Sequence, residues 1–221
     1  MSINLQRFNT SSINLYSRIV VVGNRDTGKT NLVSRDLIPS LAGPPIVYHP
    51  SDKIRAYINA GVDQDHILTE FKYQKCPIYT AHPDRTVVID DCNMFDRRTR
   101  TQLIKLFRQH RQYKVNTILV TRDYDMLPNK MGYDYMFLSN MNSRDLYQLW
   151  SNHLSRIMSD YYRFKLAFRE VTRNYGFMVA DLKTKQLFWY KAAPPPPPRF
   201  KRLKLSDWLS HVERPFSKSR Q

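Results

Sequence analysis

Residues 23–30 read Gly23-Asn24-Arg25-Asp26-Thr27-Gly28-Lys29-Thr30 and directly follow the apolar run Ile19-Val20-Val21-Val22. The spacing G-x-x-x-x-G-K-[ST] between a buried strand and a helix is typical of a phosphate-binding loop. Glycine at both fixed positions permits a tight turn and a close approach of the backbone to phosphate. The start of the following helix adds partial positive charge behind the anion. The stretch therefore predicts a nucleotide-binding α/β fold.

The loop residues have distinct expected roles. Lys29 should reach the β- and γ-phosphates, and the Thr30 hydroxyl should ligate Mg²⁺. ATP and Mg²⁺ are the expected cofactors. The predicted nucleotide-binding set consists of Gly23, Asn24, Arg25, Asp26, Thr27, Gly28, Lys29, Thr30 and Asn31.

A second apolar run ends in two acidic residues. Residues 86–91 read Thr86-Val87-Val88-Ile89-Asp90-Asp91, which predicts a buried strand with two carboxylates at its tip. Adjacent carboxylates are costly to bury without a cation. We expect Asp90 to hold Mg²⁺ and Asp91 to polarise the water that attacks the γ-phosphate. The alternative is a solvated Asp-Asp turn with no catalytic role.

Strand-like and helix-like segments alternate along the chain, which predicts a mainly parallel sheet flanked by helices. Pro39 should close the first helix, and Ser143 should cap a later one. A β-hairpin and then a five-proline run, residues 194–198, follow near the C-terminus. The expected strands are 18–22, 46–48, 67–71, 86–89, 115–121, 135–138, 176–180 and 186–190, and the expected helices are 29–36, 52–61, 97–112 and 161–172.

The expected domain organisation is simple. Residues 1–17 form an N-terminal extension, 18–191 the P-loop domain, and 192–221 a proline-rich linker with a basic tail. The chain has 221 residues, 42% of them apolar, which suits one buried core. Two cysteines without closely spaced Cys or His argue against a zinc site or a disulfide scaffold and favour a reducing compartment. No apolar run approaches the roughly 20 residues of a bilayer span, and the polar start is unlike a signal peptide.

The charge balance implies a polyanionic partner. The chain carries 35 Lys and Arg against 19 Asp and Glu, a net charge of +16. Residues 97–114 contain seven cations and no acidic residue. Such a run is often only a solvated helix face, but seven unrelieved cations repel one another and are better explained by phosphate contacts.

The phosphate loop, the acidic strand end and one further run resemble the genome-packaging ATPases of large DNA viruses, the poxvirus-type branch of the FtsK/HerA superfamily. The further run is Leu106-Phe107-Arg108-Gln109-His110-Arg111-Gln112-Tyr113-Lys114, which leads into Val115-Asn116-Thr117-Ile118-Leu119-Val120-Thr121-Arg122. The resemblance covers roughly residues 18 to 190. Arg111 matches the arginine of the family's Gly-Arg-His, although its neighbours differ. Arg122 stands where the family usually has a glutamine that senses the γ-phosphate.

The resemblance implies a catalytic set of Lys29, Asp91, Arg108, Arg111 and Arg122. Arg108 and Arg111 are candidates for an arginine that reaches a neighbouring subunit's nucleotide. It also implies a homo-oligomeric ring, contact with double-stranded DNA through backbone phosphates, and capsid or portal partners. The expected location is the host cytoplasm or nucleus at virus assembly sites, or the virion.

Two other functions stay open. A nucleotide-switched nucleic-acid-binding protein with weak hydrolysis is suggested by Arg122 in place of glutamine. A nucleotide kinase shares the loop and the open sheet, but its arginine-bearing lid and acceptor base are not found. A GTPase is disfavoured because Asn129-Lys130-Met131-Gly132 breaks the Asn-Lys-x-Asp pattern at its last position.

Overall fold

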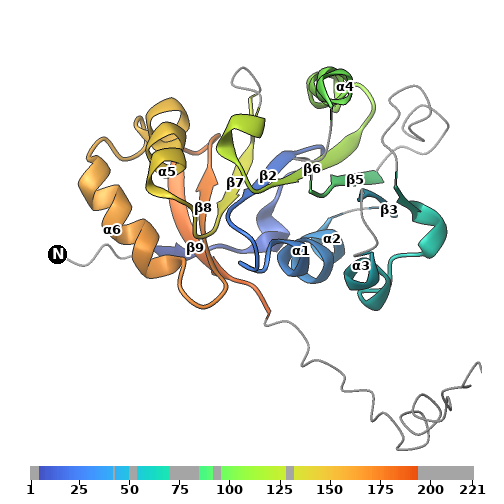
Figure 1. Cartoon of the computed structure of the whole chain (residues 1–221), viewed down its shortest axis with the longest axis horizontal. Helices are drawn as coiled ribbons and strands as arrows, with labels where there is room; N and C mark the ends of the chain where they lie inside the picture. Colours follow the sequence, from blue (N-terminus) through green and yellow to red (C-terminus); the bar gives the residue numbers. More distant parts are fainter. Residues whose placement is uncertain are drawn as a thin grey trace, which may run out of the picture.

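The computed structural model describes residues 5–41, 43–49, 54–69, 85–91, 96–127 and 132–193, and they form one mixed, mainly parallel sheet with helices on both faces (Figure 1). The proline run and the basic tail lie outside this range, as do both cysteines and the end of the predicted strand 67–71. The strands are β1 (Gln6–Arg7), β2 (Arg18–Val22), β3 (Pro45–Tyr48), β4 (Ile67–Leu68), β5 (Arg85–Ile89), β6 (Val115–Thr121), β7 (Tyr135–Leu138), β8 (Gly176–Asp181) and β9 (Gln186–Lys191).

The strand order β1-β9-β8-β7-β2-β6-β5-β3-β4 places β2 near the centre of the sheet. Strands β2 to β7 run parallel, whereas β8 is antiparallel to both β7 and β9. The central strands are buried on both sides, which explains their continuous apolar sequence. The predicted α/β fold with a terminal hairpin is confirmed.

Helices cover both faces of this sheet. One face packs against α4, α5 and α6, and the other against α1 and α3 (Figure 1). The helices are α1 (Lys29–Leu32), α2 (Ile38–Ser40), α3 (Arg55–Asn59), α4 (Arg97–Gln109), α5 (Ser143–Leu149) and α6 (Tyr161–Val171), with π-helical turns at Val33–Leu37 and Trp150–Leu154 and short 3₁₀ turns at Thr10–Ser12, Gln64–His66 and Tyr124–Met126. No helix among the described residues is long and apolar enough to cross a bilayer.

Three predicted helix boundaries are wrong, one of them the end of α4, which stops at Gln109 and not at residue 112. The first helix does not close at Pro39 but continues to Ser40 through the π-helical turn at Val33–Leu37. Pro39 is the second residue of the short α2 segment, which directly follows the π-helical turn, and the helix ends one residue after it. The fifth helix is capped by Asn142, whose side chain accepts a hydrogen bond from the Asp145 N–H, so Ser143 is the first helical residue and not the cap.

Residues before 18 also pack on this sheet. Strand β1 pairs with β9, and Phe8 is buried against Tyr135, Phe137 and Phe188.

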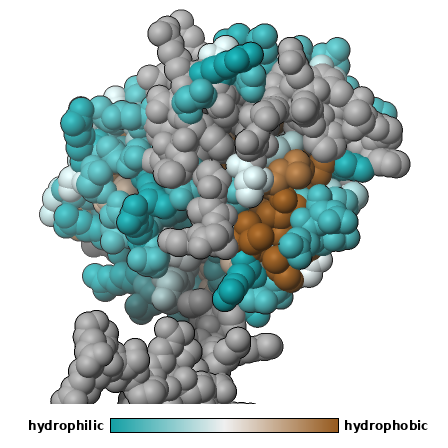
Figure 2. All heavy atoms as spheres, turned by 45° about the vertical axis from the view of Figure 1, so that its right-hand side comes forward, coloured by the Kyte–Doolittle hydropathy of each residue, from teal (hydrophilic) through white to brown (hydrophobic). Residues whose placement is uncertain are grey.

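The surface is mostly hydrophilic in the view of Figure 2, which also shows one compact hydrophobic patch on the side that comes forward from the right of Figure 1. Ile58 of α3 is among the exposed large apolar side chains.

The register brings several loop starts together at one edge of the sheet. Val22 of β2 lies opposite Thr121 of β6 and Leu138 of β7, and β5 lies on the far side of β6. The segments that follow these strands therefore meet at the carboxyl edge. The first residues of the same strands meet at the opposite, amino edge.

Candidate nucleotide-binding site

The loop between β2 and α1 depends on its two glycines. Gly28 has φ +86°, a left-handed conformation that favours glycine. A Cβ built on Gly23 would lie 1.8 Å from Ser139 Oγ, so any side chain there would collide with the segment after β7. The loop is also tied to its neighbours, since Asn24 N donates to the Asn140 carbonyl at 2.8 Å. These contacts fix the turn that the motif predicts.

Lys29 points back across this loop. Its Nζ donates to the Gly23 carbonyl at 2.6 Å and also to the Asn24 carbonyl. Burial lowers the pKa of Lys29 to about 8, although the Asp90 carboxylate nearby opposes the shift and Arg122 adds to it. A phosphate arriving here would replace carbonyl acceptors with charged ones, which bind an ammonium more strongly.

Asp90 is held by residues from three different segments. Its Oδ2 accepts from Thr30 Oγ1 at 2.9 Å and from the Tyr57 hydroxyl at 2.8 Å, while its Oδ1 accepts from Asp91 N at 2.8 Å. Asp90 is buried. The two motifs, 60 residues apart in sequence, therefore share one hydrogen bond across the carboxyl edge.

The Thr30 hydroxyl and the Asp90 carboxylate fit the ligand preferences of Mg²⁺. Mg²⁺ takes oxygen ligands and commonly uses only one or two protein groups, the rest being water and substrate phosphate. Among the described residues, no group of three or more His, Cys, Asp and Glu is arranged to hold a metal alone. A metal here thus depends on water and phosphate oxygens for the remainder of its shell.

Asp91 forms an ion pair that its sequence position did not reveal. Arg122 Nη2 lies 2.7 Å from Asp91 Oδ2, and both side chains are largely shielded from solvent. Asp91 Oδ1 is buried and has no hydrogen-bond partner among the described residues. Asp91 also has φ +55°, uncommon for a non-glycine residue. One carboxylate oxygen is thus fixed by Arg122, and the other retains acceptor capacity.

The remaining loop residues are spread around this centre. Asn24, Arg25 and Asp26 are exposed on the loop, and Thr27 Oγ1 lies 2.7 Å from Ser139 Oγ. Asn31 does not face the loop, because its side-chain amide donates to the Ala193 carbonyl after β9.

The two arginines proposed to act between subunits are elsewhere. Arg108 is exposed near the end of α4, and Arg111 lies in the turn that leads into β6. Both are at the amino edge of the sheet, away from the loop of their own chain. Any contact of theirs with a nucleotide requires a neighbouring subunit.

Two residues around Asp90 were missed at the level of sequence. Tyr57 is fully buried in α3, where burial and the Asp90 charge raise its pKa well above the usual value, so its hydroxyl remains a donor. His49 Nε2 lies 3.7 Å from Asp90 Oδ2. His49 follows β3 directly, and a correct strand order alone would have placed it beside Asp90. No motif points to Tyr57.

Comparison with known proteins identifies the fold. No protein-family model matches this sequence, and neither does any curated protein. Among solved structures, the chain is similar to the crystal structure of B204, the DNA-packaging ATPase from Sulfolobus turreted icosahedral virus, with a TM-score of 0.59 and 12% identity over 82% of this chain and 100% of that one. It is also similar to the genome-packaging NTPase B204 from Sulfolobus turreted icosahedral virus 2 in complex with AMPPCP, with a TM-score of 0.57 and 13% identity over 82% and 100%.

At this identity the likeness shows the fold alone, which is that of a P-loop NTPase. It agrees with the loop geometry described above. The activity has to be argued from the residues of this chain.

Proposed function

We propose that this protein is an ATP-hydrolysing DNA translocase that packages a viral double-stranded DNA genome, akin to the poxvirus-type packaging ATPases. The observation that carries the proposal is the hydrogen bond between Thr30 Oγ1 and Asp90 Oδ2, 2.9 Å long, beside Lys29. It joins the phosphate loop to the acidic strand end, which is the arrangement that nucleotide hydrolysis requires. A Gly-containing turn that binds no ligand would not need a hydrogen bond to a buried carboxylate.

In this proposal Thr30 and Asp90 hold Mg²⁺, which when bound neutralises charge on the phosphates. Lys29 binds the β- and γ-phosphates. Asp91 orients the attacking water through Oδ1, the oxygen that Arg122 does not engage. Arg122, which pairs with Asp91, would also interact with the γ-phosphate, in the role of the glutamine that the resembled family usually has there.

The packaging role is supported by charge and by similarity. The net charge of +16 suits a protein that holds the DNA backbone without reading bases. The structures with the same fold include proteins named as DNA-packaging or genome-packaging enzymes. A homo-oligomeric ring, capsid or portal partners, and a location at virus assembly sites are parts of the same proposal.

A second function is favoured by one observation. The ion pair between Arg122 and Asp91 neutralises the proposed general base, which would slow hydrolysis. A nucleotide-switched nucleic-acid-binding protein with slow turnover fits that pairing.

The rate of phosphate release with and without double-stranded DNA distinguishes these functions. The translocase predicts ATP hydrolysis that DNA stimulates several-fold, on protein whose assembly state is known from light scattering. Slow turnover that DNA leaves unchanged supports the switch, and turnover that requires a small phosphate acceptor supports a nucleotide kinase. Failure of the protein to bind any nucleotide would reject all three.

A further inference from the structure

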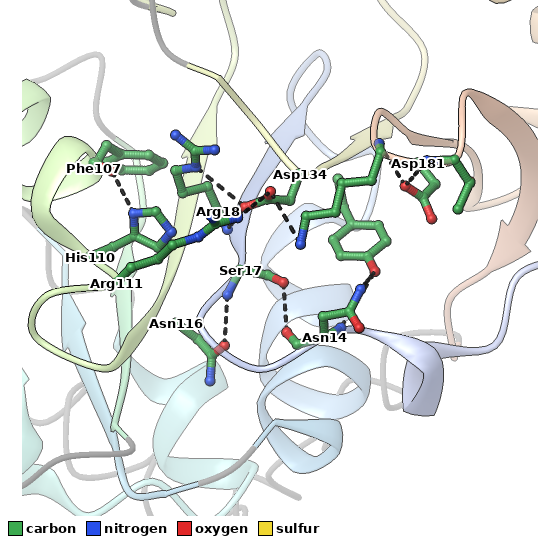
Figure 3. A network of polar contacts seen from close by, with 12 residues as sticks. Asn14, Ser17, Arg18, Phe107, His110, Arg111, Asn116, Asp134 and Asp181 are labelled. Atoms are coloured by element: carbon green, nitrogen blue, oxygen red, sulfur yellow. Dashed lines mark hydrogen bonds and ion pairs between the residues drawn. The ribbon is translucent and has the colours of Figure 1, made fainter.

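The amino edge of the sheet contains a second charged centre, built around Asp134 at the start of β7. Asp134 Oδ2 accepts from the Arg18 backbone N–H at 2.8 Å and from Arg18 Nε at 3.3 Å (Figure 3). Its Oδ1 lies 3.4 Å from Lys183 Nζ and 3.7 Å from Arg111 Nη2. Three cations from three separate segments thus converge on one carboxylate.

This centre has an excess of positive charge. Asp134 balances one cation, and the buried Asp181, which accepts from the Lys183 and Thr184 N–H groups, balances at most one more, so the described part of this centre keeps a net positive charge. The Asp134 side chain is only 3% exposed, while the side chains of Arg18, Lys183 and Arg111 are 21%, 38% and 63% exposed. The anion is therefore inside and the cations form its solvent-facing rim.

A structural clamp does not explain that excess. A single arginine satisfies a buried aspartate with hydrogen bonds and charge. Additional cations within 4 Å of the same oxygen atoms repel one another and lose side-chain entropy, while a partly exposed ion pair returns at most about 1 kcal/mol. An external anion that binds the rim removes this repulsion.

The rim continues along α4. Arg98, Lys105 and Arg108 are exposed, and their spacing of seven and three residues places them on one face of the helix. Arg111 follows directly in the turn before β6. The 13 residues of α4 span about 20 Å, so the cations form an extended stripe. Residues 97–114 contain no acidic side chain to interrupt it.

This surface is separate from the nucleotide site. Arg18 is the first residue of β2 and Val22 the last, so the strand puts about 13 Å between the two edges. A ligand at one edge therefore does not occupy the other.

We propose that the amino edge centred on Asp134, together with the exposed face of α4, binds the phosphate backbone of duplex DNA. Asp134 is a positioning residue that holds Arg18, Lys183 and Arg111 together, and those cations and Arg108 contact phosphates. The choice of DNA rests on the proposed function, whereas the location of the surface does not. A repeating backbone fits an extended stripe because each cation meets another phosphate.

The test measures binding of a 30-base-pair duplex to the full chain by fluorescence anisotropy, without nucleotide, from 50 to 200 mM salt. The variant R111A/K183A removes two rim cations. The control variant R163A/R169A removes two exposed cations from α6, which lies on the opposite side of the molecule from α4 (Figure 1). We expect the edge variant to bind at least about tenfold more weakly and to lower the log–log salt slope by roughly two, while the control retains the wild-type slope. Equal behaviour of the two variants would overturn the proposal.

Two further arms identify the partner and the role of Asp134. Polyglutamate of equal charge should bind more weakly than DNA, and equal or tighter binding would assign the edge to an acidic protein instead. The variant D134N removes a negative charge and so makes the edge more positive, yet it should lower the log–log salt slope because the cations lose the carboxylate that holds them together. A tighter complex with DNA would reject the positioning role. Thermal melts show which variants are folded, and the single variant K183A replaces any that are not.

Binding of a fluorescent ATP analogue separates this proposal from the proposed function. The single edge variant K183A, which leaves Arg111 in place, should bind it as the wild-type protein does. If the wild-type protein hydrolyses ATP but the edge variant binds DNA normally, the surface is wrong and the enzyme assignment stands. If no nucleotide binds to the wild-type protein but the edge variant loses DNA affinity, the DNA-binding surface stands and the enzyme assignment is wrong.

Discussion

The two edges of the sheet differ in how their charges are balanced. At the carboxyl edge, Lys29 and Arg122 face two carboxylates, Asp90 and Asp91, and each carboxylate has a partner within 3 Å. At the amino edge, one carboxylate serves three cations. At the carboxyl edge these two cations balance the two carboxylates, so a bound nucleotide has to replace some of their present hydrogen bonds and ion pairs. The amino edge carries net positive charge, so it can attract an anion without first breaking one of its own ion pairs. The edges therefore suit a reacting ligand and a polyanion, respectively.

The largest effect that separates the edges is expected from K29A. This change removes the cation that binds the β- and γ-phosphates, and we expect the rate of ATP hydrolysis to fall at least about 10²–10³-fold. Affinity for DNA should stay within about twofold of wild type, because Lys29 is not at the amino edge. K165A on α6 is the matched control. Unchanged hydrolysis in K29A would end the phosphate-loop assignment.

The next largest effect is expected from D91N. Removal of the general base should slow hydrolysis about 10²–10⁴-fold while binding of a fluorescent ATP analogue is retained. Loss of binding would instead assign Asp91 to the metal.

R122A provides the comparison for D91N. If Arg122 mainly restrains Asp91, the variant hydrolyses ATP faster than wild type; if it binds the γ-phosphate, the variant is slower. Single-turnover rates distinguish the two cases, and the faster variant would favour the nucleotide-switched function.

The carboxyl edge was predictable because its key residues lie in two short motifs. A phosphate loop needs Gly28, Lys29 and Thr30 at fixed spacing, and the apolar strand before Asp90 predicts where that carboxylate lies. The pairing of Arg122 with Asp91 was not predictable, since it depends on β6 lying between β2 and β5. Tyr57 was missed for a related reason, because a buried tyrosine in a short helix looks like core until its hydroxyl partner is known.

The amino edge was not predictable from sequence. Arg18, Arg111, Asp134 and Lys183 come from four segments, and no spaced motif links them. Only the register of β2 against β6 and β7, and the β8–β9 turn, brings them together. Net charge and the basic helix indicated a polyanionic partner, but they did not locate the buried carboxylate that organises the cations.

A smaller effect is expected from Y57F, which keeps the ring of α3 and removes the hydroxyl that donates to Asp90 at 2.8 Å. Loss of one hydrogen bond to a buried charged group should lower the free energy of unfolding by about 1.5–3 kcal/mol. If the hydroxyl also orients Asp90 toward Mg²⁺, the Mg²⁺ concentration for half-maximal binding of the ATP analogue should rise several-fold. Y147F, an exposed tyrosine on α5, should change neither quantity. A variant that loses stability but keeps its Mg²⁺ dependence would limit Tyr57 to packing.

The smallest effect concerns pH and the amino edge. Burial alone would raise the pKa of Asp134, but hydrogen bonds from Arg18 and the charges of Arg18 and Lys183 outweigh it, and the net pKa lies below the usual value. A carboxyl with a depressed folded-state pKa stabilises the fold above its unfolded pKa and loses that contribution as pH falls through the folded value. The stability difference between wild type and D134N should thus be largest near neutrality and shrink below about pH 4.

Denaturant unfolding of both proteins from pH 3 to 7 measures this difference. His110 also lies at this edge; burial lowers its pKa and the Asp134 charge opposes that shift, so D134N lowers the His110 pKa further. As pH falls, this contribution of His110 opposes the expected narrowing of the stability difference. E170Q on α6 removes an exposed carboxylate and should show little change of stability with pH relative to wild type. A difference for D134N that stays constant with pH would mean that the cations do not stabilise the ionised Asp134. The charge imbalance that distinguishes the two edges would then have no energetic consequence in the isolated protein.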